Sequence, residues 1–288
     1  MGLTPYIHGE KNYPITLAHS SDPPTVFFQK GEVNWSNKKC ISIVGTRNPT
    51  PRGVAFCQQL IEEFTPFSPL IVSGFARGID IVAHRKALEM GLETVAVLAH
   101  PFGQWYPKEH KGEVDKIMQN GAFVTEFWSD DPFERANFLK RNRIIAGLSH
   151  ATIVIESGEK GGSLVTASHV LAYGREVFAP PGRISDPQSQ GCLGLLKTDR
   201  ARLITNAADV ATWLEWEDRT APKTVQKRLF VNLNREEEAI FDLLKQPISL
   251  DEIALKMKRP VGQIAAELMQ LELKGAIRSL SGKRFEQL

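Results

Sequence analysis

The sequence has few cysteines, no long apolar run and no large excess of either charge. Its 288 residues include three isolated cysteines, Cys40, Cys57 and Cys192, without the CxxC or Cys/His spacing of a metal site. They predict reduced, buried thiols and therefore a cytoplasmic protein. No apolar stretch approaches the roughly 18 residues that span a bilayer, and the N-terminus lacks a signal-peptide pattern. A net charge of +2 neither favours nor excludes a nucleic-acid partner, because local clusters of charge matter more than the total.

The motifs of nucleotide-binding and hydrolytic enzymes are missing as well. Neither the dinucleotide fingerprint G-x-G-x-x-G nor the Walker A pattern G-x-x-x-x-G-K-[ST] occurs. Asp80 and His84 are four residues apart, a spacing that predicts a local hydrogen bond. The other histidines show no ligand spacing, and no Ser/His/Asp or Cys/His arrangement can be argued. We therefore expect no cofactor, no bound metal and no catalytic centre.

Short β-branched runs alternate with helical patterns from residue 39 onward. The runs predict strands at residues 40–44, 70–72, 94–98, 122–125, 151–155 and 176–179. Apolar residues between the first two runs fall on one helical face, which predicts a helix that covers the sheet. The alternation predicts an α/β fold with a doubly wound, mostly parallel sheet.

The two ends of the chain differ from this central pattern. Residues 1–38 contain four prolines, which indicates an extended N-terminal arm with one strand near residues 25–28. The central domain is expected over 39–218, and the polar segment 219–223 reads as a linker. Beyond it, three helices and a hairpin predict a small C-terminal winged-helix domain over 224–288. The elements are expected at residues 236–244, 250–257, 261–273, 276–280 and 284–286.

The loops that follow the predicted strands are rich in Gly, Ser and Arg, and ligands of open α/β sheets bind at such loops. The first loop holds Gly45, Thr46 and Arg47, where glycine would let backbone amides approach a phosphate closely. A second Gly turn follows the next predicted strand. In the loop after the fifth strand, Ser163 is expected to cap a helix that begins at Leu164.

Cations concentrate around the fifth predicted strand. Between residues 135 and 183, seven Lys or Arg side chains accompany only three acids. Several of these cations crowd a predicted helix start, which is unfavourable unless an anion offsets them, because a helix N-terminus is already partly positive. This stretch therefore predicts an anion site. Phe138 lies among the cations and either stacks on an unpaired base or packs in the core.

Several ordered motifs together resemble the DNA-processing protein family known as DprA or Smf. The resemblance covers roughly residues 39 to 212. The matching motifs are Val44-Gly45-Thr46-Arg47 with Gly53, Ser73-Gly74-Phe75-Ala76-Arg77-Gly78-Ile79-Asp80 with Ala83-His84, Tyr106-Pro107, Arg141-Asn142-Arg143-Ile144-Ile145-Ala146-Gly147-Leu148-Ser149, Gly162-Ser163-Leu164-Val165-Thr166-Ala167 and Pro181-Gly182.

The resemblance implies an extended Rossmann-like fold without a nucleotide cofactor and with a C-terminal winged helix. It also implies a homodimer that binds single-stranded DNA and loads a RecA-type recombinase during natural transformation. Arg47 and Arg52 then resemble phosphate contacts, and Phe138 resembles a base stacker. The DNA-binding residues implied by the motifs are Gly45, Thr46, Arg47, Arg52, Ser73, Gly74, Arg77, Phe138, Arg141, Asn142, Arg143, Lys160, Gly161, Gly162, Ser163 and Thr166.

Two other functions stay open at the level of sequence. Nucleotide phosphoribohydrolases carry a Pro-Gly-Gly-x-Gly-Thr loop, of which residues 161–163 are a partial echo. A transcription regulator would instead read DNA with the winged helix and sense a metabolite with the large domain. The predicted third helix of the winged-helix domain, residues 261–273, contains no Lys or Arg, which favours protein docking over sequence reading.

Overall fold

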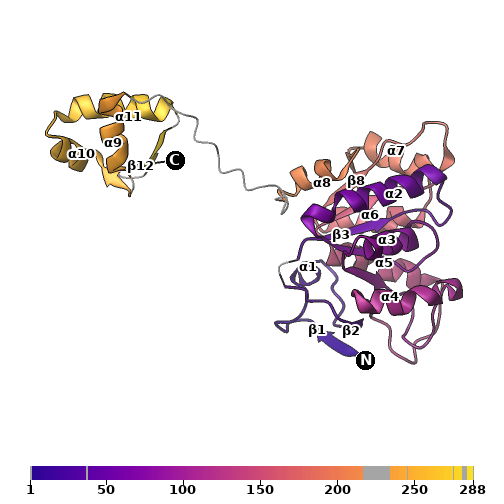
Figure 1. Cartoon of the computed structure of the whole chain (residues 1–288). Helices are drawn as coiled ribbons and strands as arrows, with labels where there is room; N and C mark the ends of the chain where they lie inside the picture. Colours follow the sequence, from indigo (N-terminus) through magenta and orange to yellow (C-terminus); the bar gives the residue numbers. More distant parts are fainter. Residues whose placement is uncertain are drawn as a thin grey trace. The chain divides into compact units, whose positions relative to one another are not determined.

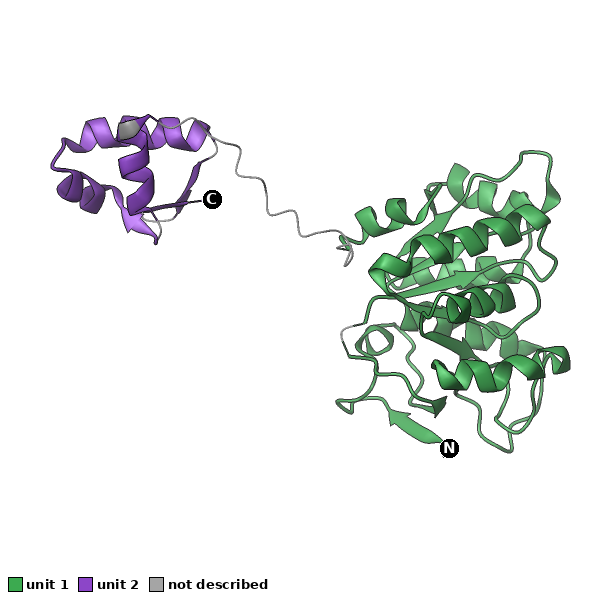
Figure 2. Cartoon of the chain, in the orientation of Figure 1, with its two compact units in different colours: residues 1–220 green, residues 221–288 purple. Residues whose placement is uncertain are grey.

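The computed structural model describes residues 2–36, 38–216, 234–244, 246–274, 276–280 and 284–287. The chain divides into two compact units, residues 1–220 and 221–288 (Figure 2). The linker expected at 219–223 lies outside the described residues. Within the described ranges, no helix combines the length and the apolar character that a bilayer crossing requires.

Nine strands of the large unit form a single sheet (Figure 1). They are β1 (Thr4–Ile7), β2 (Val26–Gly31), β3 (Cys40–Val44), β4 (Leu70–Ser73), β5 (Thr94–Val97), β6 (Gly121–Thr125), β7 (Ala151–Val154), β8 (Glu176–Ala179) and β9 (Arg202–Leu203). Their spatial order is β1-β2-β6-β5-β4-β3-β7-β8-β9, and every pair from β6 to β9 is parallel. The doubly wound, mostly parallel sheet is therefore confirmed.

Helices cover both faces of this sheet because its strands are apolar on both sides. The helices are α1 (Ile15–Ala18), α2 (Pro51–Glu63), α3 (Ile79–Glu89), α4 (Val114–Gln119), α5 (Ala136–Leu148), α6 (Gly162–Ala172), α7 (Gln190–Lys197) and α8 (Ala207–Trp213), with 3₁₀ turns at Thr65–Phe67, Lys108–Glu113 and Pro187–Ser189. In β3, Cys40 and Val44 pack in the core formed with α1, α5, α6 and α7, whereas Ile41 and Ile43 pack against α2, α3 and α8. Such burial on both faces is typical of parallel strands.

The N-terminal arm belongs to the large sheet. It contributes two strands where the sequence indicated one, and β2 pairs antiparallel with β6, with Phe28 opposite Thr125. Phe27 is fully buried and stacks on Tyr6 at a centroid distance of 4.9 Å. The first strand escaped prediction because three of its four residues are exposed, so it carries little apolar alternation.

The small unit is a winged helix with its own apolar core. Its elements are α9 (Arg235–Leu243), β10 (Ile248–Ser249), α10 (Leu250–Met257), α11 (Val261–Leu273), β11 (Ile277–Leu280) and β12 (Arg284–Gln287). Ile240, Ile253, Ile264 and Leu268 are fully buried together. The three helices and the two hairpin strands lie close to the predicted bounds, while the hairpin turn at 281–283 falls outside the described residues.

Candidate functional site

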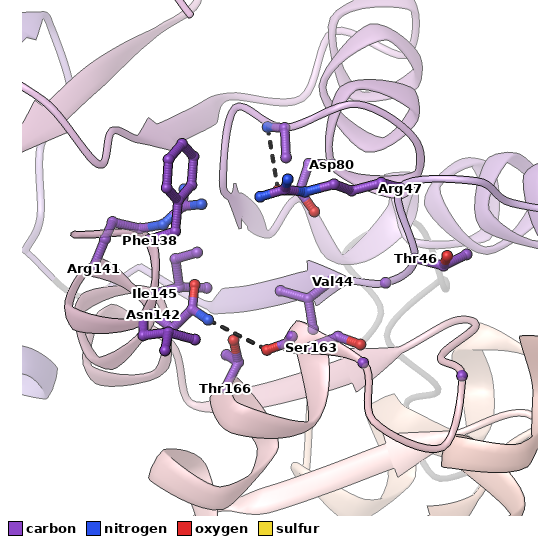
Figure 3. A pocket seen from close by; sticks show the side chains of 16 residues that line it. Val44, Thr46, Arg47, Asp80, Phe138, Arg141, Asn142, Ile145, Ser163 and Thr166 are labelled. Carbon is purple, nitrogen blue, oxygen red and sulfur yellow. Dashed lines mark hydrogen bonds between the residues drawn. The ribbon is translucent and has the colours of Figure 1, made fainter. Parts of the chain in front are cut away.

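A cavity opens where the order of the strands reverses. Strands β3 to β6 proceed to one side of β3, and β7 begins on its other side. Loops that leave adjacent strands in opposite directions create a crevice at their carboxyl ends. Figure 3 shows the side chains that line this cavity. Its volume is about 230 Å³. Its lining residues are Val44, Gly45, Thr46, Arg47, Ala76, Asp80, Phe138, Leu139, Arg141, Asn142, Ile145, Gly158, Gly161, Gly162, Ser163 and Thr166.

The loop after β3 forms one wall and is held rigidly. A Cβ atom on Gly45 would lie 2.6 Å from Ile79 and 3.1 Å from the carbonyl oxygen of Glu156, so the close packing of this loop requires glycine. The Thr46 amide donates to the Glu156 carbonyl at 2.7 Å, which ties the loop to the end of β7. Arg47 projects from this fixed base, with its guanidinium carbon 5.2 Å from the centroid of the Phe138 ring.

The N-terminus of α6 forms the opposite wall. This helix begins at Gly162, and Gly161 occupies the N-cap position without a side-chain cap. The prediction that Ser163 caps a helix starting at Leu164 is therefore wrong: the Ser163 hydroxyl instead donates to the Ser157 hydroxyl at 2.9 Å. Asn142 donates from Nδ2 to the Gly162 carbonyl at 3.3 Å and fixes α6 against α5. The first-turn amides of α6 thus begin the helix without a side-chain acceptor, an arrangement that suits an anion.

The floor of the cavity contains a buried charge. Arg141 is only 4% exposed, and its guanidinium donates to the Val97 carbonyl, while its Nε has no hydrogen-bond partner among the described residues. Burial lowers the pKa of Arg141 to about 10, and nearby Asp80 opposes that shift. Arg141 therefore carries its positive charge at neutral pH. Burial also raises the pKa of the Asp80 carboxyl, against the opposing effect of Arg141.

Gly74 and Ser73 support this floor from beneath. A side chain on Gly74 would overlap the Arg141 guanidinium and the Asp80 carboxylate. Ser73 is fully buried, and its hydroxyl donates to the Ile43 carbonyl at 2.6 Å, so it does not line the cavity. The local hydrogen bond expected between Asp80 and His84 is absent from the described contacts, because the His84 ring lies 2.6 Å from the Gly74 carbonyl oxygen and 2.7 Å from Thr94 Oγ1.

Two predicted contacts are occupied by acidic partners. Arg77 is directed at Glu109, with Nε and a terminal nitrogen 2.6 and 2.7 Å from the two carboxylate oxygens. Arg143 pairs with Glu126 and donates to the Asp22 carbonyl, so it joins α5 to the N-terminal arm rather than lining the cavity. The motifs implied that both arginines contact DNA. Their acidic partners, Glu109 and Glu126, lie 17 or more residues away in sequence, so only the fold reveals these ion pairs.

Most of the remaining predicted residues line the cavity, and two do not. Arg52 is exposed in the first turn of α2, and Lys160 is exposed in the loop before α6; neither lines the cavity. Phe138 is half-buried and lines the cavity, as do Thr166 and Asn142. The predicted set lacked six residues that line the cavity, because no spacing signal links α5 to the loops after β3, β4 and β7. They are Val44, Ala76, Asp80, Leu139, Ile145 and Gly158.

Comparison with known proteins identifies the relatives of the chain. The family model of DNA recombination-mediator protein A matches residues 4–215, and the model of the DprA winged helix domain matches residues 228–283. The DNA processing protein DprA of Bacillus subtilis is 38% identical over 201 residues, which cover 69% of this chain and 67% of that protein. Protein Smf of Escherichia coli is 32% identical over 276 residues, which cover 94% of this chain and 74% of that protein.

Two solved structures resemble the large unit. DNA processing protein A of Streptococcus pneumoniae aligns with a TM-score of 0.70 and 33% identity, over 75% of each chain. A structure describing the single-stranded DNA binding mode of DNA processing protein A from Helicobacter pylori aligns with a TM-score of 0.67 and 27% identity, over 75% of this chain and 98% of that one. The chain therefore belongs to the DNA recombination-mediator protein A family, the DNA-processing proteins also named DprA or Smf.

Proposed function

We propose that the large unit binds single-stranded DNA without strong sequence preference in the cavity between β3 and β7. The observation that carries the proposal is that an uncapped helix N-terminus, the exposed Arg47 side chain and the buried, positively charged Arg141 side chain line one cavity. These groups are donors only, so they match the phosphates of a nucleic-acid backbone. The binding mode described for the Helicobacter pylori relative supports the same ligand class here.

Phosphate would be held between the two walls of the cavity. Backbone amides of Gly162 and Ser163 approach from α6, and the Arg47 guanidinium approaches from the loop after β3. Lys160 is exposed in the loop before α6 and Arg52 is exposed in the first turn of α2, and both would attract the flanking phosphates. Arg77 and Arg143 are left out of this proposal because Glu109 and Glu126 already neutralise them.

A base would stack on Phe138. The ring lines the cavity and already carries the Arg47 guanidinium near its face. Stacking on an aromatic ring accepts every base, because each has a π-face, and this explains binding without sequence preference.

The family suggests how this binding is used. We infer that the protein acts as a homodimer that places a RecA-type recombinase on single-stranded DNA during natural transformation. The large unit would hold the strand, and the winged helix would contact a protein partner. No enzymatic step is needed for this role, and we propose none.

The test is a binding titration with single- and double-stranded oligonucleotides of the same sequence, run beside a nucleotide-hydrolysis assay. We expect preference for the single strand, and a log-log slope of affinity against salt of about −0.7 for each phosphate neutralised. Preference for duplex, or binding that does not depend on salt, would contradict the proposal. Release of a free base from a nucleotide would instead support a phosphoribohydrolase activity.

A further inference from the structure

Phe138 belongs to a cluster of three aromatic rings that reaches beyond the cavity. The ring centroids lie 5.9 Å apart for Tyr106 and Phe138, 6.0 Å apart for Phe133 and Phe138, and 5.1 Å apart for Tyr106 and Phe133. All three pairs meet edge to face. The rings come from three different segments: the loop after β5, the loop after β6 and helix α5. They therefore support one another as one surface, which we call the aromatic platform.

The outer rings of the platform are open to solvent. Tyr106 is 45% exposed and Phe133 is 43% exposed. Single exposed apolar residues need no explanation, but a contiguous exposed aromatic group adjoining a ligand cavity indicates a contact surface. Two half-exposed rings in contact with a third that lines the cavity make a continuous path from the cavity to the surface.

A second hollow adjoins the outer rings. Its volume is about 550 Å³, and Tyr106, Phe133, Lys108 and Lys111 are among the residues that line it. Both lysines are exposed, and neither forms an ion pair with another residue in the part of the chain that the structure describes. The acid between them, Glu109, is engaged by Arg77. The lysines of this hollow are therefore available to an anion.

Charge is distributed unevenly around the platform. On the Phe133 side, Asp131 and Glu134 are exposed, and the Asp131 carboxylate accepts a hydrogen bond from the Trp128 amide. These acids would repel a phosphate. On the Tyr106 side stand Lys108 and Lys111, which would attract one. A ligand on the platform should therefore place an uncharged ring over Phe133 and its anionic groups toward the lysines.

We propose that the aromatic platform is a second stacking site for unpaired bases, along which the DNA strand leaves the cavity, with Lys108 and Lys111 contacting its phosphates. The inference rests on the proposed function, since it extends the path of the same strand. A base-and-phosphate ligand fits better than an apolar protein segment, because aromatic rings interleaved with lysines suit alternating bases and phosphates. Each stacked base contributes to affinity independently of its identity.

The experiment compares a short and a long oligothymidylate, of about 4 and about 16 nucleotides, within the range of single-strand site sizes in other folds. The variant is the double substitution Tyr106→Ala and Phe133→Ala in the full chain. We expect its affinity for the long strand to fall roughly 5- to 150-fold, the effect of losing one stacked base. Affinity for the short strand, which Phe138 and the cavity hold, should change by less than about threefold.

Two further variants serve as controls. Tyr106→Phe keeps the ring and should keep the affinity for the long strand. Trp213→Ala removes a ring of similar exposure, 52%, that packs on Arg202 and lies outside the platform, and it should leave both affinities unchanged. Photo-crosslinking of a long strand that carries 4-thiothymidine should label peptides containing Tyr106 or Phe133 in addition to Phe138.

The outcomes separate the two proposals. If the wild-type chain binds neither strand, the proposed function itself is wrong. If the wild-type chain binds both and the double variant binds the long strand normally, the platform is not a DNA site and a protein partner becomes the better reading. An equal loss for both strands would also overturn the inference, because it would mean that the outer rings act only by holding Phe138.

Discussion

The cavity of the large unit and the winged helix differ in how their cations and helix starts are partnered. In the large unit, Arg47, Arg52 and Lys160 are exposed. No acidic side chain among the described residues forms an ion pair with any of them. In the winged helix, Arg259 lies 2.6 Å from Glu267, and Lys274 lies 2.6 Å from Glu237. A count of formal charges therefore does not predict anion binding in either unit, because a cation that already pairs with an acid is less available to an anion.

The helix starts differ in the same direction. Asn234 and Ser249 form capping boxes with Glu237 and Glu252, so the amides that begin α9 and α10 are already satisfied. Helix α6 begins without a side-chain cap and without an acid in its first turn. Helix α11 also lacks a side-chain cap, but its exposed residues include Val261, Met269 and Leu273, which are apolar. An anion site therefore fits the large unit better than the winged helix.

The largest expected effect is that of Arg47→Ala on single-stranded DNA binding. A charge-assisted hydrogen bond contributes about 1.5–3 kcal/mol, so its loss should weaken binding about 10- to 100-fold. The side chain is exposed, and thermal unfolding should change little. Fluorescence anisotropy with a labelled oligonucleotide measures the loss.

Arg77→Ala is the matched control for this substitution. It removes an exposed arginine from a neighbouring strand-end loop, but one that Glu109 already neutralises. We expect an effect of less than about threefold. Equal losses for the two variants would contradict the claim that available charge decides, and would indicate that the acidic partner releases Arg77 when DNA binds.

The second prediction concerns pH, because all seven histidines lie in residues 1–220. Burial lowers the pKa of His84 to about 4, and it also lowers the pKa values of His100, His110 and His150. As pH falls, the histidines of the unfolded chain take up protons near pH 6.5, whereas these buried histidines of the folded large unit do so only at lower pH. The free energy of unfolding of this unit should therefore fall as pH drops from 7 to 5, by on the order of 2 kcal/mol for His84 alone.

The winged helix should behave differently in the same range. Hydrogen bonds lower the pKa values of Glu237 and Glu252, so their contribution to stability is lost only as pH falls below 4.5, the ordinary pKa of a glutamate. All five tryptophans lie in the large unit, so their fluorescence follows its unfolding in urea separately.

In the large unit, burial raises the pKa values of Asp80 and Glu126, whose effect on the pH dependence of stability is opposite to that of the histidines. His84→Gln should make the free energy of unfolding of the large unit depend less on pH. An unchanged dependence would contradict the role given to His84.

The third prediction separates stability from binding at the start of α6. Gly162→Asp places a carboxylate beside the first-turn amides, which should stabilise the helix by about 0.3–1 kcal/mol and repel phosphate. We expect the melting temperature to be maintained or raised while DNA affinity falls about tenfold. Gly162→Ala is the steric control, because a Cβ atom there meets nothing within 4 Å. Tight binding by the aspartate variant would remove α6 from the site.

Much of the fold follows from local pattern, and the site follows only in part. Six strands were predicted because parallel strands are apolar on both faces, and the cavity lies at the loops after the first and fifth of them. The loops after β3 and β7 and helix α5 were brought together as expected. The partners of Arg77 and Arg143 could not be predicted, since they depend on which distant acids the fold brings near.

Other misses have equally physical causes. The start of α6 was misplaced because Ser163 resembles a cap, whereas the extended conformation of Gly161 begins the helix earlier. The aromatic platform escaped prediction because Tyr106, Phe133 and Phe138 lie on separate segments with no common spacing. Asp80 was expected to bond to His84, but its carboxylate lies beside the buried Arg141.

The smallest expected effect tests the central claim that the large unit holds the DNA site. A fragment of residues 1–220, the first compact unit, should bind single-stranded DNA within about threefold of the full chain and with the same salt slope. The isolated winged helix, residues 221–288, should select no preferred duplex from a random-sequence pool. Loss of most single-strand affinity from a folded 1–220 fragment, or enrichment of a defined duplex by the winged helix, would contradict this account.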